Sequence, residues 1–247
     1  MTEIKKYEKE QEKFEIACKN AENLSIVQNA GAAFQAVVVV KSLRELLTDE
    51  IMKDVFMPLM NTKIGFLTDR TGKPDRKGNI KPLYSLDIVR DAIIDAASFG
   101  LLPTFNQFNI IAEKMYPTKE GFTSLLKKLG VIYVLNFGED LSKPDAKFAQ
   151  ISVKINYKIK DEDQKPFIMM AVVPKNAYSS YDQLKGKAER RAKKMLYEYV
   201  TGLDLGEYDG DSDNDTGRRR VEDAEVVQQN EPAPNQPEPG ETEKVEI

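Results

Sequence analysis

The residues that could carry acid–base or nucleophilic chemistry are few in this chain. It contains no histidine and one cysteine, Cys18. Catalysis of this kind needs a group that titrates near neutral pH or an activated nucleophile, and Cys18 lies in an apolar stripe that predicts packing. No glycine-rich loop followed by Lys-Ser or Lys-Thr occurs, so ATP use is not expected. We therefore expect a protein that is not an enzyme and uses no cofactor.

A metal centre has one candidate, the acidic run Asp161, Glu162 and Asp163 in "KIKDEDQK". A metal nuclease needs two or three acids that converge beside a lysine on a strand, whereas this run falls between two predicted strands. We expect a solvated hairpin turn there. Zinc lacks its usual histidine and cysteine ligands, so the sequence predicts no metal site.

Binding of nucleic acid needs no titrating group, because ordered positive charge holds phosphates and aromatic rings hold bases. Basic residues gather in four places: a loop over 63–81, the end of a helix near 128, a strand near 154 and the last helix. The candidate phosphate contacts are Lys119, Lys127, Lys128, Lys154, Lys158, Lys187, Arg190, Arg191 and Lys194. The candidate stacking residues are Phe105, Phe108, Tyr116 and Phe122.

The net charge of −4 hides a contrast between two parts of the chain. Residues 203–247 carry 14 acidic residues against Arg218, Arg219, Arg220 and Lys244, whereas residues 1–202 have 32 basic and 26 acidic residues. The acidic part is rich in proline and glutamine, so it cannot bury enough apolar surface to fold and is predicted to be disordered. It could dock a partner, compete with nucleic acid for the basic part, or only keep the protein soluble.

The elements that must position these residues follow from hydrophobic periodicity. We predict an α+β fold: N-terminal helices, a small antiparallel sheet and a long C-terminal helix, followed by the disordered acidic tail. The organisation is 1–24 as a charged helix, 25–202 as the binding domain and 203–247 as the tail. The stripe of Ile4, Tyr7 and Phe14 on the first helix has no evident partner, so it is a candidate contact between subunits.

The individual elements are predicted as follows. Helices are expected near 31–47, 49–60, 86–99, 119–129 and 179–201, with Ser85 and Thr118 as N-caps and Gly100 and Gly130 as stops. One strand is expected over 107–116, and others over 131–137, 147–160 and 165–174. The strand around Lys154 alternates apolar and polar residues, and Asp161 to Gln164 are expected to form its turn. On the last helix, Ala188, Ala192, Met195, Leu196 and Tyr199 form the expected buried stripe.

No signal segment and no apolar run of membrane-spanning length is evident in the sequence, the longest apolar run being Ala36 to Val40. A single cysteine excludes an intramolecular disulfide. We expect a soluble protein of a reducing cytoplasm, without a membrane partner.

Two segments resemble a known family. Gly100, Leu101 and Pro103 end a predicted helix, a strand follows, and Gly121, Leu125, the pair Lys127–Lys128 and Gly130 mark the next helix. With "KGKAERRAKKMLYEYVTG" near the C-terminus, containing Ala188, Arg191 and Leu196, this pattern resembles the RecT/Redβ family of phage single-strand annealing proteins. The resemblance covers roughly residues 86–202. Lys119 and Glu120 stand where the family has a tyrosine and a basic residue, and its usual Ile-Pro-Phe is missing.

The resemblance implies a function without ATP. Such proteins bind single-stranded DNA, assemble into rings or helical filaments and anneal complementary strands in phage-type homologous recombination. They usually act beside a phage 5′→3′ exonuclease and a host single-strand binding protein, which implies the cytoplasm of a bacterial host. Two alternatives remain open from the residues: a non-enzymatic interaction or assembly protein with a solvated basic surface, and a binder of double-stranded RNA.

Overall fold

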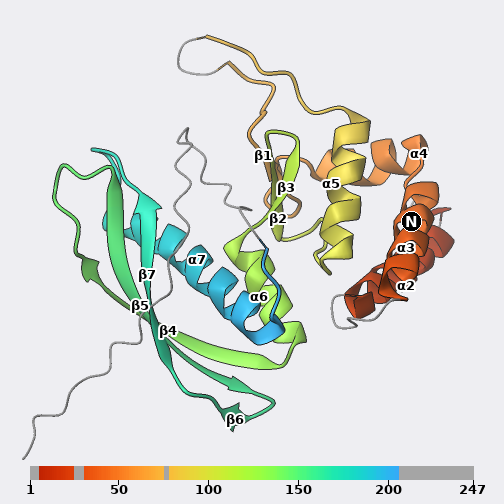
Figure 1. The fold of residues 1–247 in the computed structure, drawn as a ribbon. Helices are drawn as coiled ribbons and strands as arrows, with labels where there is room; N and C mark the ends of the chain where they lie inside the picture. Colours follow the sequence, from red (N-terminus) through yellow and green to blue (C-terminus); the bar gives the residue numbers. More distant parts are fainter. Residues whose placement is uncertain (1–5, 25–30, 75–77, 206–247) are drawn as a thin grey trace, which may run out of the picture. The chain divides into compact units, whose positions relative to one another are not determined.

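A computed structural model of the chain describes residues 6–24, 31–74 and 78–205. The predicted disordered tail beyond Leu205, and Ile4 of the N-terminal stripe, lie outside these residues. The described part has the predicted α+β composition, with helices before the sheets and a long helix after them (Figure 1).

The N-terminal part is helical. Helix α2 (Glu8–Leu24) packs against α3 (Ala32–Leu46), and a helical turn α4 (Asp49–Ile51) continues into a π-helix, Met52–Phe56, and a short 3-10 helix, Met57–Leu59. The stripe on α2 is covered by this chain: the Phe14 ring lies 5.6 Å from that of Phe56, the Tyr7 hydroxyl donates to Asp54 at 2.5 Å, and Cys18 is buried. The described part of the stripe therefore has an intramolecular partner, while Tyr7 and Phe14 remain partly exposed, and its role as a subunit contact stays a prediction.

The first sheet joins three short strands: β1 (Leu67–Thr68), β2 (Phe108–Ile111) and β3 (Lys114–Pro117). The single strand predicted over 107–116 is wrong, because the chain reverses at Ala112 and Glu113, whose φ angles are 48° and 68°. Both central residues of this two-residue hairpin turn have positive φ, a conformation usually taken by Asn and Gly. Neither alanine nor glutamate is typical of such a turn, so the turn could not be predicted from the sequence.

The second sheet is antiparallel, with β5 (Phe148–Ile159) between β4 (Val131–Asp140) and β7 (Phe167–Pro174); a short β6 (Glu162–Asp163) also pairs with β5. The predicted alternation on β5 is confirmed: Ile151, Val153, Ile155 and Tyr157 are buried, and Lys154 and Lys158 are exposed on the other face. The turn after β5 is formed by Lys160 and Asp161, whose φ angles are 49° and 69°, rather than by Asp161 to Gln164.

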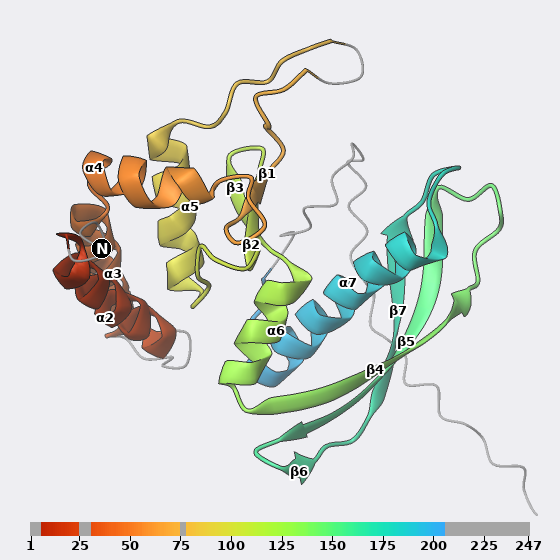
Figure 2. The same cartoon turned by 180° about the vertical axis from the view of Figure 1, so that it is seen from behind.

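Three further helices complete the fold: α5 (Leu86–Ser98), α6 (Lys119–Lys128) and α7 (Tyr181–Thr201). Thr118 caps α6 as predicted, accepting the N–H of Gly121 at 3.1 Å, whereas Ser85 occupies the N-cap position of α5 without a side-chain hydrogen bond. α7 begins with a capping box and ends at Gly202, whose φ is 70°. It packs against α6 and against one face of the second sheet, at β5 and β7 (Figure 2). Ile151 is buried, so it lies on the face that α7 covers.

The buried face of α7 differs from the predicted stripe. It consists of Leu184, Ala188, Ala192, Lys193, Leu196 and Tyr197. Ala188, Ala192 and Leu196 of the predicted stripe are buried, whereas Met195 and Tyr199 are exposed, so the assignment of these two residues to the buried stripe is wrong.

Gly121 explains how the N-terminus of α6 meets the β2–β3 hairpin. A Cβ atom at this position would lie 2.0 Å from the carbonyl oxygen of Gln107. Only glycine allows the helix to approach that backbone. This contact places the start of α6, and with it Lys119, beside the segment that leads into β2.

Candidate nucleic-acid interface

An open groove with a volume of about 480 Å³ brings several of the predicted residues together. One wall comes from the segment before α6, the hairpin and the first turn of α6: Asn106, Asn109, Ile111, Tyr116, Pro117, Thr118, Lys119 and Glu120. The other wall comes from the turn before α7 and the first half of that helix: Asn176, Ser179, Gln183, Gly186, Lys187 and Arg190. We call it the α6–α7 groove.

The electrostatics of the α6–α7 groove favour an anion. Its lining contains the cations Lys119, Lys187 and Arg190 against one acid, Glu120. The first turn of α6 and the start of α7 both border the groove, and the N-terminus of a helix carries partial positive charge. Phosphate groups are therefore the chemical class that this lining suits best.

The charge distinguishes this groove from a larger one of about 680 Å³ beside α2 and α3. That groove is lined by Lys6 and Lys13 but also by Glu10, Glu45 and Glu50. Its positive charges are outnumbered, so it is unsuited to a polyanion.

Two consecutive residues with a strained backbone lie at one wall of the α6–α7 groove, which Asn106 lines. Phe105 and Asn106 have φ angles of 55° and 53°, a left-handed conformation that costs about 1–2 kcal/mol for a residue with a Cβ. Their N–H groups donate to the carbonyls of Ile64 and Gly65 at 2.8 and 2.7 Å, and Thr118 Oγ1 donates to the Asn106 carbonyl at 2.5 Å. These hydrogen bonds hold the wall in place despite the strain.

The same wall holds two buried acceptors. Among the described residues, the side-chain oxygens of Asn106 and Asn109 are buried and accept no hydrogen bond. Buried acceptors without a donor are rare in folded proteins. Because both oxygens are buried, a ligand in the groove does not reach them, and their missing hydrogen bonds are a local cost of this conformation.

The opposite wall contains a glycine that packing does not require. Gly186 lies inside α7, and a Cβ atom built there meets nothing within 4 Å. Glycine in a helix interior costs about 0.8–1.0 kcal/mol relative to alanine. Since no neighbour demands its small size, the open space beside Gly186 belongs to the groove itself.

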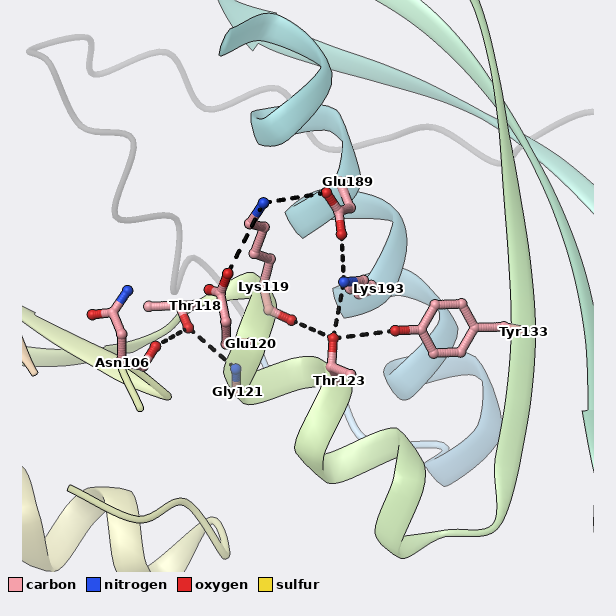
Figure 3. A network of polar contacts seen from close by, with 9 residues as sticks. All are labelled: Asn106, Thr118, Lys119, Glu120, Gly121, Thr123, Tyr133, Glu189 and Lys193. Atoms are coloured by element: carbon pink, nitrogen blue, oxygen red, sulfur yellow. Dashed lines mark hydrogen bonds and ion pairs between the residues drawn. The ribbon is translucent and has the colours of Figure 1, made fainter. Parts of the chain in front are cut away.

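A polar network beneath the groove fixes α6 against α7 (Figure 3). The buried Lys193 donates to Glu189 Oε1 at 2.5 Å and to Thr123 Oγ1 at 2.9 Å, and Tyr133 lies 3.2 Å from the same hydroxyl. Glu189 also accepts from Lys119 at 3.5 Å. Glu189 therefore links the groove lysine to the buried lysine.

Two opposing effects set the pKa of Glu189. Burial alone would raise it, but the hydrogen bond from Lys193 and the charges of Lys193 and Lys119 outweigh burial and lower the pKa below its usual value. Glu189 is therefore ionised at neutral pH and neutralises part of the positive charge below the groove.

The structure brings together Tyr116, Lys119, Lys187 and Arg190 from the set predicted by sequence. It does not bring Lys127 and Lys128 to them, because these residues end α6 about 12 Å along the helix from Lys119. Lys128 instead donates to the carbonyl of Gly100 at 2.7 Å.

The remaining basic candidates also lie outside the lining of the groove. Lys154 and Lys158 are on the face of the sheet opposite α7, where Lys158 pairs with Asp163 at 3.1 Å. Arg191 and Lys194 were predicted on the exposed side of α7 but are half-buried, and Lys194 pairs with Glu198 at 3.7 Å. The sequence indicated the basic character of α7 but not which residues face the groove.

The aromatic candidates separate into core and surface. Phe108 and Phe122 are completely buried, which corrects their assignment as stacking residues. Phe108 stacks on Phe66 at 5.2 Å, and Phe122 lies 6.2 Å from Tyr197. Phe105 is exposed but outside the groove lining, so Tyr116 is the predicted aromatic residue that lines it.

Sequence reasoning missed the polar residues of the lining, Asn106, Asn109, Asn176, Ser179 and Gln183, and the glycine at 186. Uncharged residues in turns carry no signal for phosphate binding. One signal was present, since a glycine inside an otherwise strong helical pattern indicates a packing or functional reason.

Metal binding finds no support in the described ranges, where no group of three histidine, cysteine, aspartate or glutamate side chains could hold an ion. None of the described helices is long and apolar enough to cross a bilayer. No protein-family model, curated protein or solved structure matches the chain.

Proposed function

We propose that this protein binds single-stranded DNA in the α6–α7 groove, without ATP, and anneals complementary strands in phage-type homologous recombination. The observation that carries the proposal is the convergence of Lys119, Lys187 and Arg190 with Tyr116 on one groove. Cations and an aromatic ring in one groove are the features that sequence-tolerant binding of single strands requires. The resemblance to annealing proteins supports DNA as the polymer.

The proposal includes assembly into a ring or filament, a cytoplasmic location in a bacterial host, and action beside a 5′→3′ exonuclease and a single-strand binding protein. Self-association is supported by α3, which exposes Phe34, Val37 and Val38 on one face. Exposed apolar residues that are neighbours on a helix are typical of interaction surfaces. This face is a second candidate contact between subunits, beside the N-terminal stripe.

Binding can be measured by fluorescence anisotropy with a labelled single strand, the duplex of the same sequence, and single- and double-stranded RNA. Single-stranded DNA should bind most tightly, and replacing Lys187 and Arg190 together by glutamate should abolish tight binding. The matched control is the double replacement of Lys154 and Lys158 by glutamate, on the far face of the sheet, which should bind as the unchanged protein does.

Preference for double-stranded RNA, or equal loss of binding in both double variants, would contradict the proposed site. Absence of binding to every nucleic acid would favour an interaction protein with a solvated basic surface. The thermal unfolding of each variant shows whether the substitutions leave the fold intact.

A further inference from the structure

The turn between β7 and α7 displays one aromatic side chain almost completely to solvent. Tyr178 is 93% exposed, the largest value among the exposed large apolar residues in the described part of the chain. Asn176, two residues before it, and Ser179, the residue after it, both line the α6–α7 groove. Tyr178 therefore lies at the rim of that groove.

The turn itself is held by its own hydrogen bonds. The N–H of Tyr178 donates to Asn176 Oδ1 at 2.9 Å, the N–H of Asn176 donates to Ser179 Oγ at 3.0 Å, and the N–H of Ser179 donates to the Asn176 carbonyl at 3.0 Å. Asn and Ser side chains that bond to nearby backbone in this way fix a turn. The backbone beneath Tyr178 is thus ordered before any ligand arrives.

Both ends of the turn are anchored. Lys175 pairs with Asp140 at 2.9 Å, and both side chains are mostly buried. The hydroxyl of Tyr181 donates to the Gly138 carbonyl at 2.8 Å, and Ser180 and Gln183 form the capping box that starts α7. The turn is therefore attached to β4 on one side and to α7 on the other.

A tyrosine on such a frame is suited to binding. A tyrosine side chain has only two torsion angles, so immobilising its ring costs little conformational entropy, while the ring offers a large flat contact area. We infer that Tyr178 is a base-stacking residue of the α6–α7 groove, where it receives a nucleobase of a single strand whose phosphates lie against Lys187 and Arg190. The inference rests on the proposed function and adds to it the contact that recognises unpaired bases.

The chemistry of the neighbours selects this ligand over others. A lone exposed tyrosine would suit any partner, but Asn176 and Ser179 in the same turn line a groove that also contains the cations Lys187 and Arg190. A single strand of nucleic acid offers one phosphate and one base in each nucleotide, so it presents an anion and an aromatic face side by side. Stacking on an aromatic ring is worth about 1–3 kcal/mol per base, which is about 5-fold to 150-fold in affinity.

The chain contains no tryptophan, so Tyr178→Trp introduces a single fluorescent reporter. Its emission should be strongly quenched when a single-stranded oligonucleotide saturates the full-length protein, and much less when the matching abasic oligonucleotide does. Tyr199→Trp is the control, because Tyr199 is also exposed but packs near Phe167 at the other end of α7. Its emission should not respond to either ligand.

Affinity supplies an independent measurement. Tyr178→Ala should weaken binding of the normal oligonucleotide by about fivefold or more and leave binding of the abasic one unchanged, while Tyr178→Phe should bind as the unchanged protein does. Equal affinities of the alanine variant and the unchanged protein for the normal strand would overturn the inference while leaving the proposed function in place.

Two further outcomes are decisive. Emission of the Tyr178→Trp variant that follows protein concentration rather than oligonucleotide would assign the turn to contacts between copies of the chain and overturn the inference. If the unchanged protein binds neither oligonucleotide, the proposed function and the stacking role fail together.

Discussion

Replacing Gly186 tests whether a ligand occupies the open space of the α6–α7 groove. Gly186 is inside α7, where alanine is favoured over glycine by about 0.8–1.0 kcal/mol. A Cβ atom there meets no neighbour within 4 Å. Gly186→Ala should therefore stabilise the protein by about 0.5–1 kcal/mol, and a change of 1 kcal/mol raises the melting temperature by about 2–4 °C for a folded part of this size.

A larger side chain at the same position should separate stability from function. Gly186→Leu keeps the gain in helix propensity but fills the groove beside Lys187. If a strand of DNA lies against α7, the leucine side chain should clash with it, and relieving that clash should cost about 1–3 kcal/mol of binding free energy. Each 1.4 kcal/mol lowers the affinity about tenfold. Affinity should fall in the order Gly, Ala, Leu while the melting temperature does not fall.

The two quantities are measured by thermal unfolding followed by circular dichroism and by anisotropy with a labelled single strand. Gly121→Ala is the matched comparison, because its Cβ atom would lie 2.0 Å from the Gln107 carbonyl oxygen. It should destabilise the protein by about 1–3 kcal/mol. A Gly186→Leu variant that melts at or above the original temperature and binds DNA with unchanged affinity would refute the placement of the ligand against α7.

Further predictions concern salt, acid and the buried core. With phosphate contacts from Lys119, Lys187 and Arg190, the slope of log affinity against log salt should be about −2 for a single strand; a slope near zero would argue against phosphate contact. The free energy of unfolding should fall as pH falls below about 4, because Asp140 and Glu189 have pKa values lowered in the folded protein from 3.8 and 4.5; their stabilisation is present above the unfolded values and is lost as the folded groups protonate. Stability that is independent of pH between 5 and 2 would contradict this. Replacing Lys193 by methionine should cost about 1–3 kcal/mol at pH 7 by removing the closer of the two cationic partners of Glu189, and the cost should shrink in acid; a constant cost would show that the ion pair is not its cause.

The acidic tail is tested by truncation after Leu205. Sequence composition predicts disorder for the remaining residues, so the truncated protein should keep its circular dichroism and melting temperature. Its affinity for DNA should be unchanged or higher, since the removed segment is strongly acidic. A truncated protein that no longer folds would contradict the predicted disorder.

The sequence predicted elements where local signals agree with the fold. The alternation around Lys154, the cap at Thr118 and the stops at Gly100 and Gly130 act within a few residues of themselves, and each is present in the structure. The turn at Ala112 and Glu113 was missed because its residues carry no turn preference and tertiary contacts impose the conformation.

The candidate site was harder to predict, because its members come from segments about 70 residues apart. Lys119 and Lys187 were among the candidates, yet nothing local distinguishes them from Lys127, which ends the same helix as Lys119. Phe122 is close to basic residues in the sequence, but it lies on the side of α6 that faces the core and is completely buried. Which side chains converge is set by the packing of α6 on α7, and that contact is not visible in sequence periodicity.

The most direct test of the account is annealing of two complementary oligonucleotides by the full-length protein, without ATP and with a metal chelator present. Annealing should be much faster than without protein. Replacing Lys187 and Arg190 by glutamate should abolish the acceleration, and replacing Lys154 and Lys158 by glutamate should leave it unchanged. An unaccelerated reaction with the unchanged protein, or full acceleration by the Lys187 and Arg190 double variant, would contradict the proposed function.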